Sequence, residues 1–186
     1  MQGTVLWREL VLGSPDDWEQ PSATFDTRVE GHIQMPPPSQ YFRAGAGLLI
    51  VNGQGHVLAI ERADVPGAWQ LPQGGLEDSE EPLDAALREA TEETGIPKGA
   101  LELVRTCPEP LVYELPPEAR SEKTGRGQVL YWFLFRFHGA DAVVDVRDGK
   151  EAKHWRWMSF AAVLDGVTGF RKPMYQRLSQ EFNEHL

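Results

Sequence analysis

Cysteine and long apolar stretches are nearly absent from this chain of 186 residues. The only cysteine, Cys107, cannot form an internal disulfide, which is typical of proteins that fold in a reducing compartment. No apolar run approaches the roughly 20 residues of a transmembrane helix. The first residues also lack the basic and apolar regions of a secretory signal. We therefore expect a cytoplasmic protein that has no membrane partner.

Positive charge is scarce as well, with 18 Lys and Arg residues against 28 Asp and Glu residues and a net charge of −10. Residues 74–96 alone carry a net charge of −7, so the other 163 residues carry only −3. Non-specific binding of duplex DNA requires a basic surface. The composition therefore argues against duplex DNA as a partner and directs attention to the acidic stretch.

The acidic stretch at residues 74–96, GGLEDSEEPLDAALREATEETGI, predicts a helix over residues 81–94. Pro82 suits a first helical turn, where its missing N–H is not needed, and Gly95 is a typical helix terminator. One stripe recurs at three- and four-residue spacing, as expected of a buried helix face. The stripe consists of Leu83, Ala86, Leu87, Ala90 and Thr94.

A second face of this helix carries three glutamates, Glu89, Glu92 and Glu93, at positions i, i+3 and i+4. Like charges at this spacing repel each other by about 0.2–0.5 kcal/mol per pair, and the last helical turn also disfavours acids. A bound divalent cation relieves both effects, and carboxylate oxygens are the ligands that Mg²⁺ and Mn²⁺ prefer. The alternative is a solvated acidic face on which Arg88 pairs with Glu92 one turn later.

The whole stretch resembles the Nudix box of the Nudix hydrolases, G-x5-E-x7-R-E-U-x-E-E-x-G-U, where U is an aliphatic residue. The matching positions are Gly74, Glu80, Arg88, Glu89, Glu92, Glu93, Gly95 and Ile96, and Ala90 is small for its U position. The resemblance implies an α/β fold, namely a Nudix-type α/β/α sandwich with a mixed β-sheet and a catalytic loop-helix-loop. It also implies hydrolysis of a diphosphate linkage that is attached to another group.

The family pattern implies that the three box glutamates bind Mg²⁺, for which Mn²⁺ can substitute. A backbone carbonyl at Gln73 or Gly74 would add a ligand. Glu80 and Arg88 would brace the loop and orient the metal ligands. The implied catalytic set is Arg88, Glu89, Glu92 and Glu93. Which glutamate acts as the general base stays open, and Glu151 is a further candidate.

Motifs outside the box resemble the dinucleoside polyphosphate hydrolases and the bacterial RNA pyrophosphohydrolases. They are the segment WQLPQGG at residues 69–75, the pairs at 127–128 and 132–133, WRW at 155–157, and the terminal segment 170–182. The implied substrate is a dinucleoside polyphosphate or the 5′-triphosphate end of RNA. The alternatives are ADP-ribose, a nucleotide sugar or a nucleoside triphosphate. A non-catalytic binding protein is less well supported, because the box is intact.

The same pattern implies four further site residues. Glu151 matches a glutamate that completes the metal site, although it could be an exposed loop acid. Arg43 and Arg62 match basic residues near the polyphosphate, and the planar arginine fork suits phosphate oxygens. Phe170 matches an aromatic residue that stacks on a base. Arg62 could instead form a surface ion pair, and Phe170 could be a core anchor. The chain departs from the family at 129–131, where VLY replaces a segment that usually carries lysines.

The chain divides into an N-terminal arm, residues 1–40, and a Nudix hydrolase domain, residues 41–186. We expect the arm to pack on its own domain or on a second subunit, which would make a homodimer. We expect strands at residues 46–51, 56–61, 101–106, 111–115, 128–137, 143–146 and 153–158. The apolar run at 128–137 is the expected central strand. We expect further helices at 159–164 and 170–182.

Overall fold

Strands and helices alternate along the computed structural model, which describes residues 40–146, 152–167 and 169–186. The strands are β1 (Phe42–Val51), β2 (Val57–Arg62), β3 (Trp69–Gln70), β4 (Gln73–Gly75), β5 (Leu101–Thr106), β6 (Leu111–Glu114), β7 (Gly127–Phe137) and β8 (Ala152–Met158). The α-helices are α1 (Pro82–Thr94), α2 (Phe160–Gly166) and α3 (Lys172–Glu181). Residues 1–39 of the expected arm lie outside the described residues, so its boundary and its role in a homodimer stay predictions.

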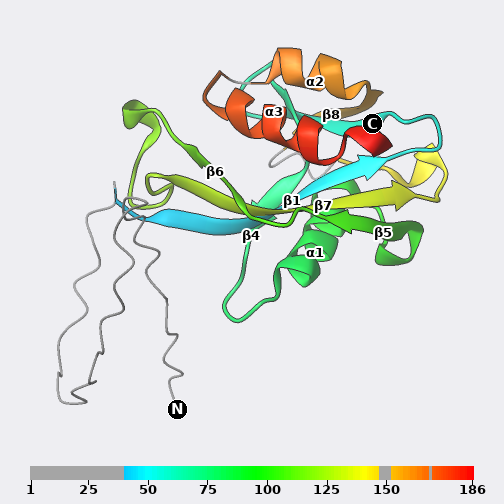
Figure 1. Ribbon diagram of the computed structural model, residues 1–186, viewed down its shortest axis with the longest axis horizontal. Helices are drawn as coiled ribbons and strands as arrows, with labels where there is room; N and C mark the ends of the chain where they lie inside the picture. Colours follow the sequence, from blue (N-terminus) through cyan, green and yellow to red (C-terminus); the bar gives the residue numbers. More distant parts are fainter. Residues whose placement is uncertain (1–39, 147–151, 168) are drawn as a thin grey trace. The chain divides into compact units, whose positions relative to one another are not determined.

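The strands of the described region join one mixed sheet (Figure 1). Its main path runs β3-β2-β1-β7-β5, while β4 pairs with β1, β6 with β7 and β8 with β2. β1 and β7 are parallel, in a register that pairs Phe42 with Gly127 and Val51 with Arg136, and the other strand pairs are antiparallel. The predicted central strand is confirmed as β7. β1 begins four residues before the predicted strand, because its pairing with β7 continues to Phe42.

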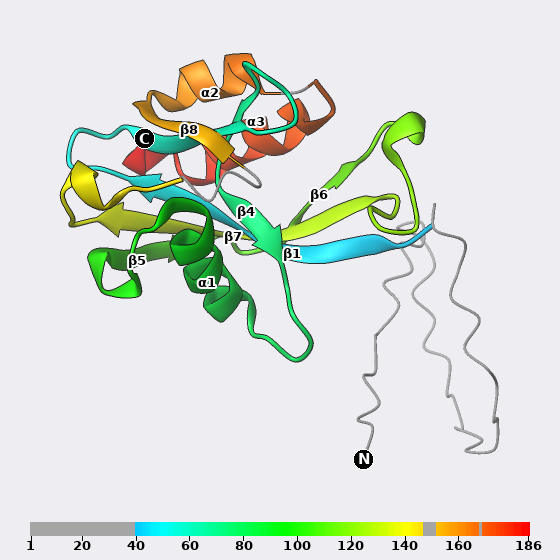
Figure 2. The same cartoon turned by 180° about the vertical axis from the view of Figure 1, so that it is seen from behind.

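Helices cover both faces of the sheet, α1 on one side and α2 with α3 on the other (Figures 1 and 2). Successive residues of β1 supply the two cores, as the alternation of a strand requires. Leu49 packs in the cluster that includes α2 and α3, whereas Leu48 and Ile50 pack in the cluster that includes α1. The predicted α/β/α sandwich is therefore confirmed. No helix of the described ranges is long and apolar enough to cross a membrane.

Helix α1 forms where the sequence predicts it, and Gly95 ends it in the left-handed conformation with φ 70°. Its buried face differs from the predicted stripe. Glu89 and Glu93 are each only 8% exposed, whereas Leu83 and Leu87 are partly exposed. The helix therefore turns two of its acids inward, toward the segment that precedes it in the chain.

The prediction of a short strand at residues 143–146 is wrong. Asp141–Val143 forms a single 3₁₀ turn, and the backbone continues to Val146 without a strand. The Asp145 N–H donates to the Thr94 carbonyl at 2.8 Å. Because the last carbonyls of a helix lack partners within the helix, this segment closes the end of α1 and does not join the sheet.

The last helix begins two residues later than predicted. A 3₁₀ turn at Gly169–Arg171 precedes α3, which has a proline in its first turn. Proline is favoured at this position because the first helical N–H groups have no partner within the helix. Met174, Leu178 and Phe182 are buried, as the four-residue spacing predicts.

Candidate active site

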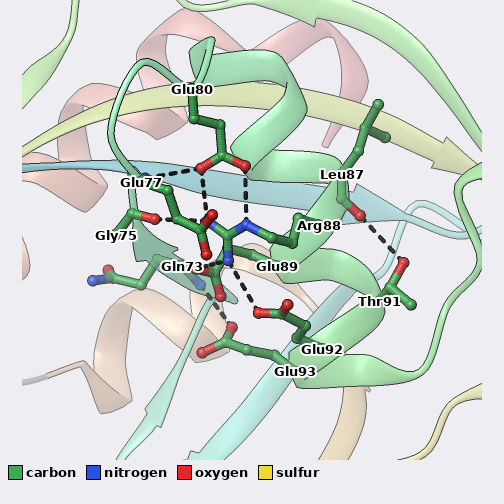
Figure 3. A network of polar contacts seen from close by, with 10 residues as sticks. All are labelled: Gln73, Gly75, Glu77, Glu80, Leu87, Arg88, Glu89, Thr91, Glu92 and Glu93. Carbon is green, nitrogen blue, oxygen red and sulfur yellow. Dashed lines mark hydrogen bonds and ion pairs between the residues drawn. The ribbon is translucent and has the colours of Figure 1, made fainter. Parts of the chain in front are cut away.

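Arg88, in the middle of α1, is the centre of a polar network that reaches the loop before the helix (Figure 3). Its Nε and Nη2 donate to the two carboxylate oxygens of Glu80 at 2.9 and 2.8 Å. Its Nη1 donates to Glu89 at 2.8 Å and to Glu92 at 3.0 Å, and Nη2 also donates to the Gly75 carbonyl at 2.8 Å. One guanidinium therefore links the loop before the helix to two of the predicted metal ligands.

Glu80 joins the loop to this network. It accepts from the Glu77 N–H at 3.0 Å as well as from Arg88. The hydrogen bond from Arg88, and then the one from the Glu77 backbone, lower the pKa of Glu80 to about 2. The same hydrogen bond is the main cause of the raised pKa of Arg88. These contacts are the ones that a brace of the loop would make.

Glu89 lies directly against the backbone of Gly74. A Cβ atom on Gly74 would lie 1.8 Å from the carboxyl carbon of Glu89 and 1.9 Å from one of its oxygens. A side chain at this position would therefore displace the Glu89 carboxylate. The Gly74 carbonyl oxygen faces β1, where it lies 2.5 Å from the position of a Cβ on Gly45.

Glu93 is held by the strand that enters the box. Its Oε2 accepts from the Gln73 N–H at 2.9 Å, and both residues are 8% exposed. Glu92 is different, since 59% of its side chain is exposed. The three glutamates therefore differ in environment: Glu89 and Glu93 are buried, whereas Glu92 faces solvent.

The carboxylates offer the oxygen donors that Mg²⁺ and Mn²⁺ prefer. Glu89 and Glu92 both lie within 3.0 Å of the same Arg88 nitrogen, so their oxygens approach one position. Within the described ranges, however, no three His, Cys, Asp or Glu residues gather closely enough to hold an ion. The ligand roles of the glutamates and of Gly74 therefore stay predictions. Glu151 lies outside the described residues.

A cavity of about 370 Å³ adjoins this network. It is lined by Arg43, Arg62, Asp64, Gln70, Gln73, Gly74, Gly75, Glu89, Gln128 and Arg171. Both arginines that the sequence associates with the polyphosphate therefore face the same space as Glu89. Residues 129–131, which stand where the family usually carries lysines, do not line it.

The two predicted phosphate-binding arginines have different partners. Arg62 forms a two-pronged ion pair with Asp64, through Nε at 2.8 Å and Nη2 at 2.6 Å. This pairing lowers the pKa of Asp64 and raises that of Arg62. Arg43 has no ion pair with a residue in the described part of the chain, and its guanidinium lies beside Gly75. Arg43 is thus available to an anion, whereas Arg62 shares its charge with Asp64.

Phe170 does not line the cavity, but its neighbour Arg171 does. The Phe170 ring packs on the core, 5.6 Å from the ring centroid of Tyr113. Arg171 is only 7% exposed and donates to Gln70 Oε1 and, at 3.1 Å, to the Tyr113 hydroxyl. Sequence analysis missed Arg171, although it lies within the terminal motif. The stacking role of Phe170 stays a prediction.

Comparisons with known proteins agree with this architecture. The family profile described as NUDIX domain matches residues 41–178. An RNA pyrophosphohydrolase of Cereibacter sphaeroides is 37% identical over 157 residues, which cover 82% of this chain and 97% of that protein. The protein named Nudix hydrolase 26, chloroplastic, of Arabidopsis thaliana is 33% identical over 82% of this chain and 74% of its own length.

Solved structures show the same fold. The Ap4A hydrolase binary complex of C. elegans has a TM-score of 0.60 at 22% identity and covers 76% of this chain and 98% of its own. The dihydroneopterin triphosphate pyrophosphohydrolase of E. coli has a TM-score of 0.63 at 21% identity, over 77% and 99% of the two chains. At these identities the likeness concerns the fold and not the substrate.

Proposed function

The chain belongs to the Nudix family and hydrolyses pyrophosphate bonds, and on that premise we propose that its substrate is the 5′-triphosphate end of RNA or a dinucleoside polyphosphate, cleaved with Mg²⁺. The relatives named RNA pyrophosphohydrolase support this choice, because the match spans nearly their whole length. Each substrate presents a chain of phosphates joined to a nucleoside.

The observation that carries the proposal is the shared cavity. Arg43 and Arg62 line it together with Glu89, so phosphate-binding groups face the carboxylate that the family pattern assigns to the metal. Arginine binds phosphate oxygens through two parallel N–H groups, which fixes both position and orientation. A polyphosphate in this cavity would therefore lie between the arginines and the acidic helix.

The residues of the chain divide the work of hydrolysis. When bound, Mg²⁺ would neutralise phosphate charge and make water a stronger nucleophile. Glu89, Glu92 and Glu93 would hold it, with Glu151 as the further ligand expected from the family pattern. Arg88 keeps two of these carboxylates in place through its Nη1. The guanidinium groups of Arg43 and Arg62 line the cavity and would supply positive charge to the phosphates.

A substrate panel tests the proposal. Phosphate release would be measured with Mg²⁺ on 5′-triphosphate RNA, diadenosine tetraphosphate, ADP-ribose and free nucleoside triphosphates. We expect fast turnover of at least one of the first two, and the ratio of the two kcat/KM values identifies the preferred substrate. Turnover of ADP-ribose or nucleoside triphosphates alone would overturn the substrate assignment while leaving the family chemistry in place.

A further inference from the structure

A chain of hydrogen bonds crosses the wall of the cavity and connects four side chains that neither the metal nor the phosphate assignments use. Arg171 Nη2 donates to the Tyr113 hydroxyl at 3.1 Å, and that hydroxyl donates to Gln128 Oε1 at 2.5 Å. Gln73 Nε2 donates to the same Gln128 oxygen at 2.9 Å. Arg171, Gln128 and Gln73 all line the cavity. The chain thus runs from a buried cation to the strand that enters the Nudix box.

The direction of this chain follows from the chemistry of Arg171. A guanidinium only donates hydrogen bonds, so the Tyr113 oxygen accepts and its proton must go onward. Gln128 therefore presents its carbonyl oxygen to Tyr113, and Gln73 must present its NH₂ group to that oxygen. The two ends of a glutamine amide are usually hard to distinguish, but here the network assigns them.

This orientation leaves Gln73 Oε1 as the last atom of the chain of hydrogen bonds. This oxygen is buried and has no hydrogen-bond partner among the described residues, and the residue as a whole is 8% exposed. The Gln73 N–H is held by Glu93, which fixes the backbone. Figure 3 shows that its side chain extends away from the α1 glutamates. A buried acceptor without a partner is unfavourable, so a ligand that supplies a donor is favoured at this point.

We propose that Gln73 Oε1 accepts a hydrogen bond from the nucleoside part of the substrate, either a base N–H or a ribose hydroxyl. This inference rests on the proposed nucleotide substrate. Ionised phosphate oxygens only accept hydrogen bonds, so the polyphosphate cannot supply the donor. The polyphosphate instead suits the N–H groups of Arg43 and Arg62. Gln73 is thereby a specificity-determining residue. Tyr113, Gln128 and Arg171 are positioning residues, which keep the acceptor end of Gln73 facing the cavity.

The test compares a substrate with analogues that lack one donor each. The substrate is whichever nucleotide of the panel the wild-type protein hydrolyses. One analogue replaces the base by a base without its exocyclic amine, and the other carries 2′-deoxyribose. We expect one analogue to lose roughly 5- to 100-fold in kcat/KM with the wild type, because the buried acceptor is then left unpaired. The affected analogue identifies the donor.

Gln73→Met removes the acceptor and keeps the side-chain length. In this variant the substrate and both analogues should have kcat/KM values within about twofold of each other. Gln176→Met, on the exposed face of α3, is the matched control and should discriminate as the wild type does. Discrimination that survives in Gln73→Met would overturn the proposal. A kcat/KM that falls by the same factor for the substrate and for both analogues, relative to the wild type, would also overturn it, since it would indicate a structural role.

Tyr113→Phe tests the positioning chain without touching Gln73. The ring and its packing remain, but the link that orders Gln128 is lost, so the Gln73 amide can present either end. We expect a narrower discrimination between substrate and analogue, through KM and with kcat retained. Discrimination equal to that of the wild type would show that Tyr113 does not orient the Gln73 amide. If the wild-type protein does not hydrolyse the proposed substrates, the proposed function fails. That result is separate, because it comes from the substrate panel alone and not from the variants.

Discussion

The carboxylate of Glu89 occupies the space where a side chain on Gly74 would stand. A Cβ atom on Gly74 would lie 1.8 Å from its carboxyl carbon, far closer than any non-bonded contact allows. Gly74 belongs to β4, and Glu89 lies in the middle of α1. The first glycine of the Nudix box is therefore fixed by its contact with an acid 15 positions later in the chain.

Gly74→Ala should displace Glu89 and lower kcat strongly. A misplacement of about 1 Å in a catalytic group can cost on the order of 100-fold in rate, and we expect a loss of that size. The measurement is steady-state hydrolysis of the best substrate of the panel. The matched control is Gly75→Ala, whose new Cβ would meet only the mobile end of Arg43 at 3.2 Å. Equal effects of the two substitutions would contradict the spatial argument.

Glu93→Gln should lower turnover by about 10²–10⁴-fold, the usual contribution of a group that serves proton transfer or binds the metal. The fold should survive, because the amide oxygen can still accept from the Gln73 N–H. Turnover and Tm would be measured on the same preparation. Near-normal turnover would contradict a catalytic role for Glu93, and a large fall in Tm would contradict the expectation that the fold survives.

Asp64→Asn should release Arg62 from its ion pair and lower KM for a polyphosphate substrate several-fold. The freed guanidinium can then place both prongs on phosphate oxygens. The effect should shrink at high salt, because exposed charges are screened. The measurement is KM at low and high ionic strength, with Arg62→Met expected to raise KM. An unchanged KM in both variants would show that neither residue contacts the substrate.

The pair between Glu80 and Arg88 should make stability depend on pH. The pKa of Glu80 in the fold is about 2, below its ordinary value of 4.5, so the ionised form is favoured by folding. This contribution is present above the unfolded pKa and is lost as pH falls from about 4.5 toward 2. The Tm difference between wild type and Glu80→Gln should therefore be largest near neutrality and shrink in acid.

Arg88→Met supplies the control for this pH dependence. Without the guanidinium the pKa of Glu80 should return toward its ordinary range, because the hydrogen bond from Arg88 is the main cause of the shift. In that background the Tm difference caused by Glu80→Gln should depend much less on pH, because only the weaker effect of the Glu77 N–H remains. A Tm difference that depends on pH as strongly as in the wild-type background would contradict the role assigned to Arg88.

Local signals in the sequence were sufficient for the helix that carries the glutamates. Proline at its start, glycine at its end and the apolar spacing between them predicted α1 to within one residue. Such features act through the backbone of the segment itself, so no knowledge of the rest of the fold is needed. The run of apolar and aromatic residues that became β7 was also recognisable, because a strand buried on both faces shows little alternation.

Local signals failed where a distant segment decided the outcome. Residues 143–146 have the composition of a strand, yet Asp145 pairs with the end of α1. Glu89 and Glu93 were recognised as acids on one helix face, but their burial depends on β4 passing beneath them. In both cases a hydrogen-bond partner from another part of the chain overrides the local preference.

The sequence by itself determined the chemistry of this protein, because the spacing of its acids, arginine and glycines within one short stretch is a pattern of family-wide meaning. Only the tertiary structure decided which residues share the cavity. Arg171 meets Gln70 and Tyr113, which lie 101 and 58 residues away from it. Periodicity reports neighbours within one helix or strand and carries no information on such pairs. These pairs are set by the arrangement of the sheet and the helices that cover it.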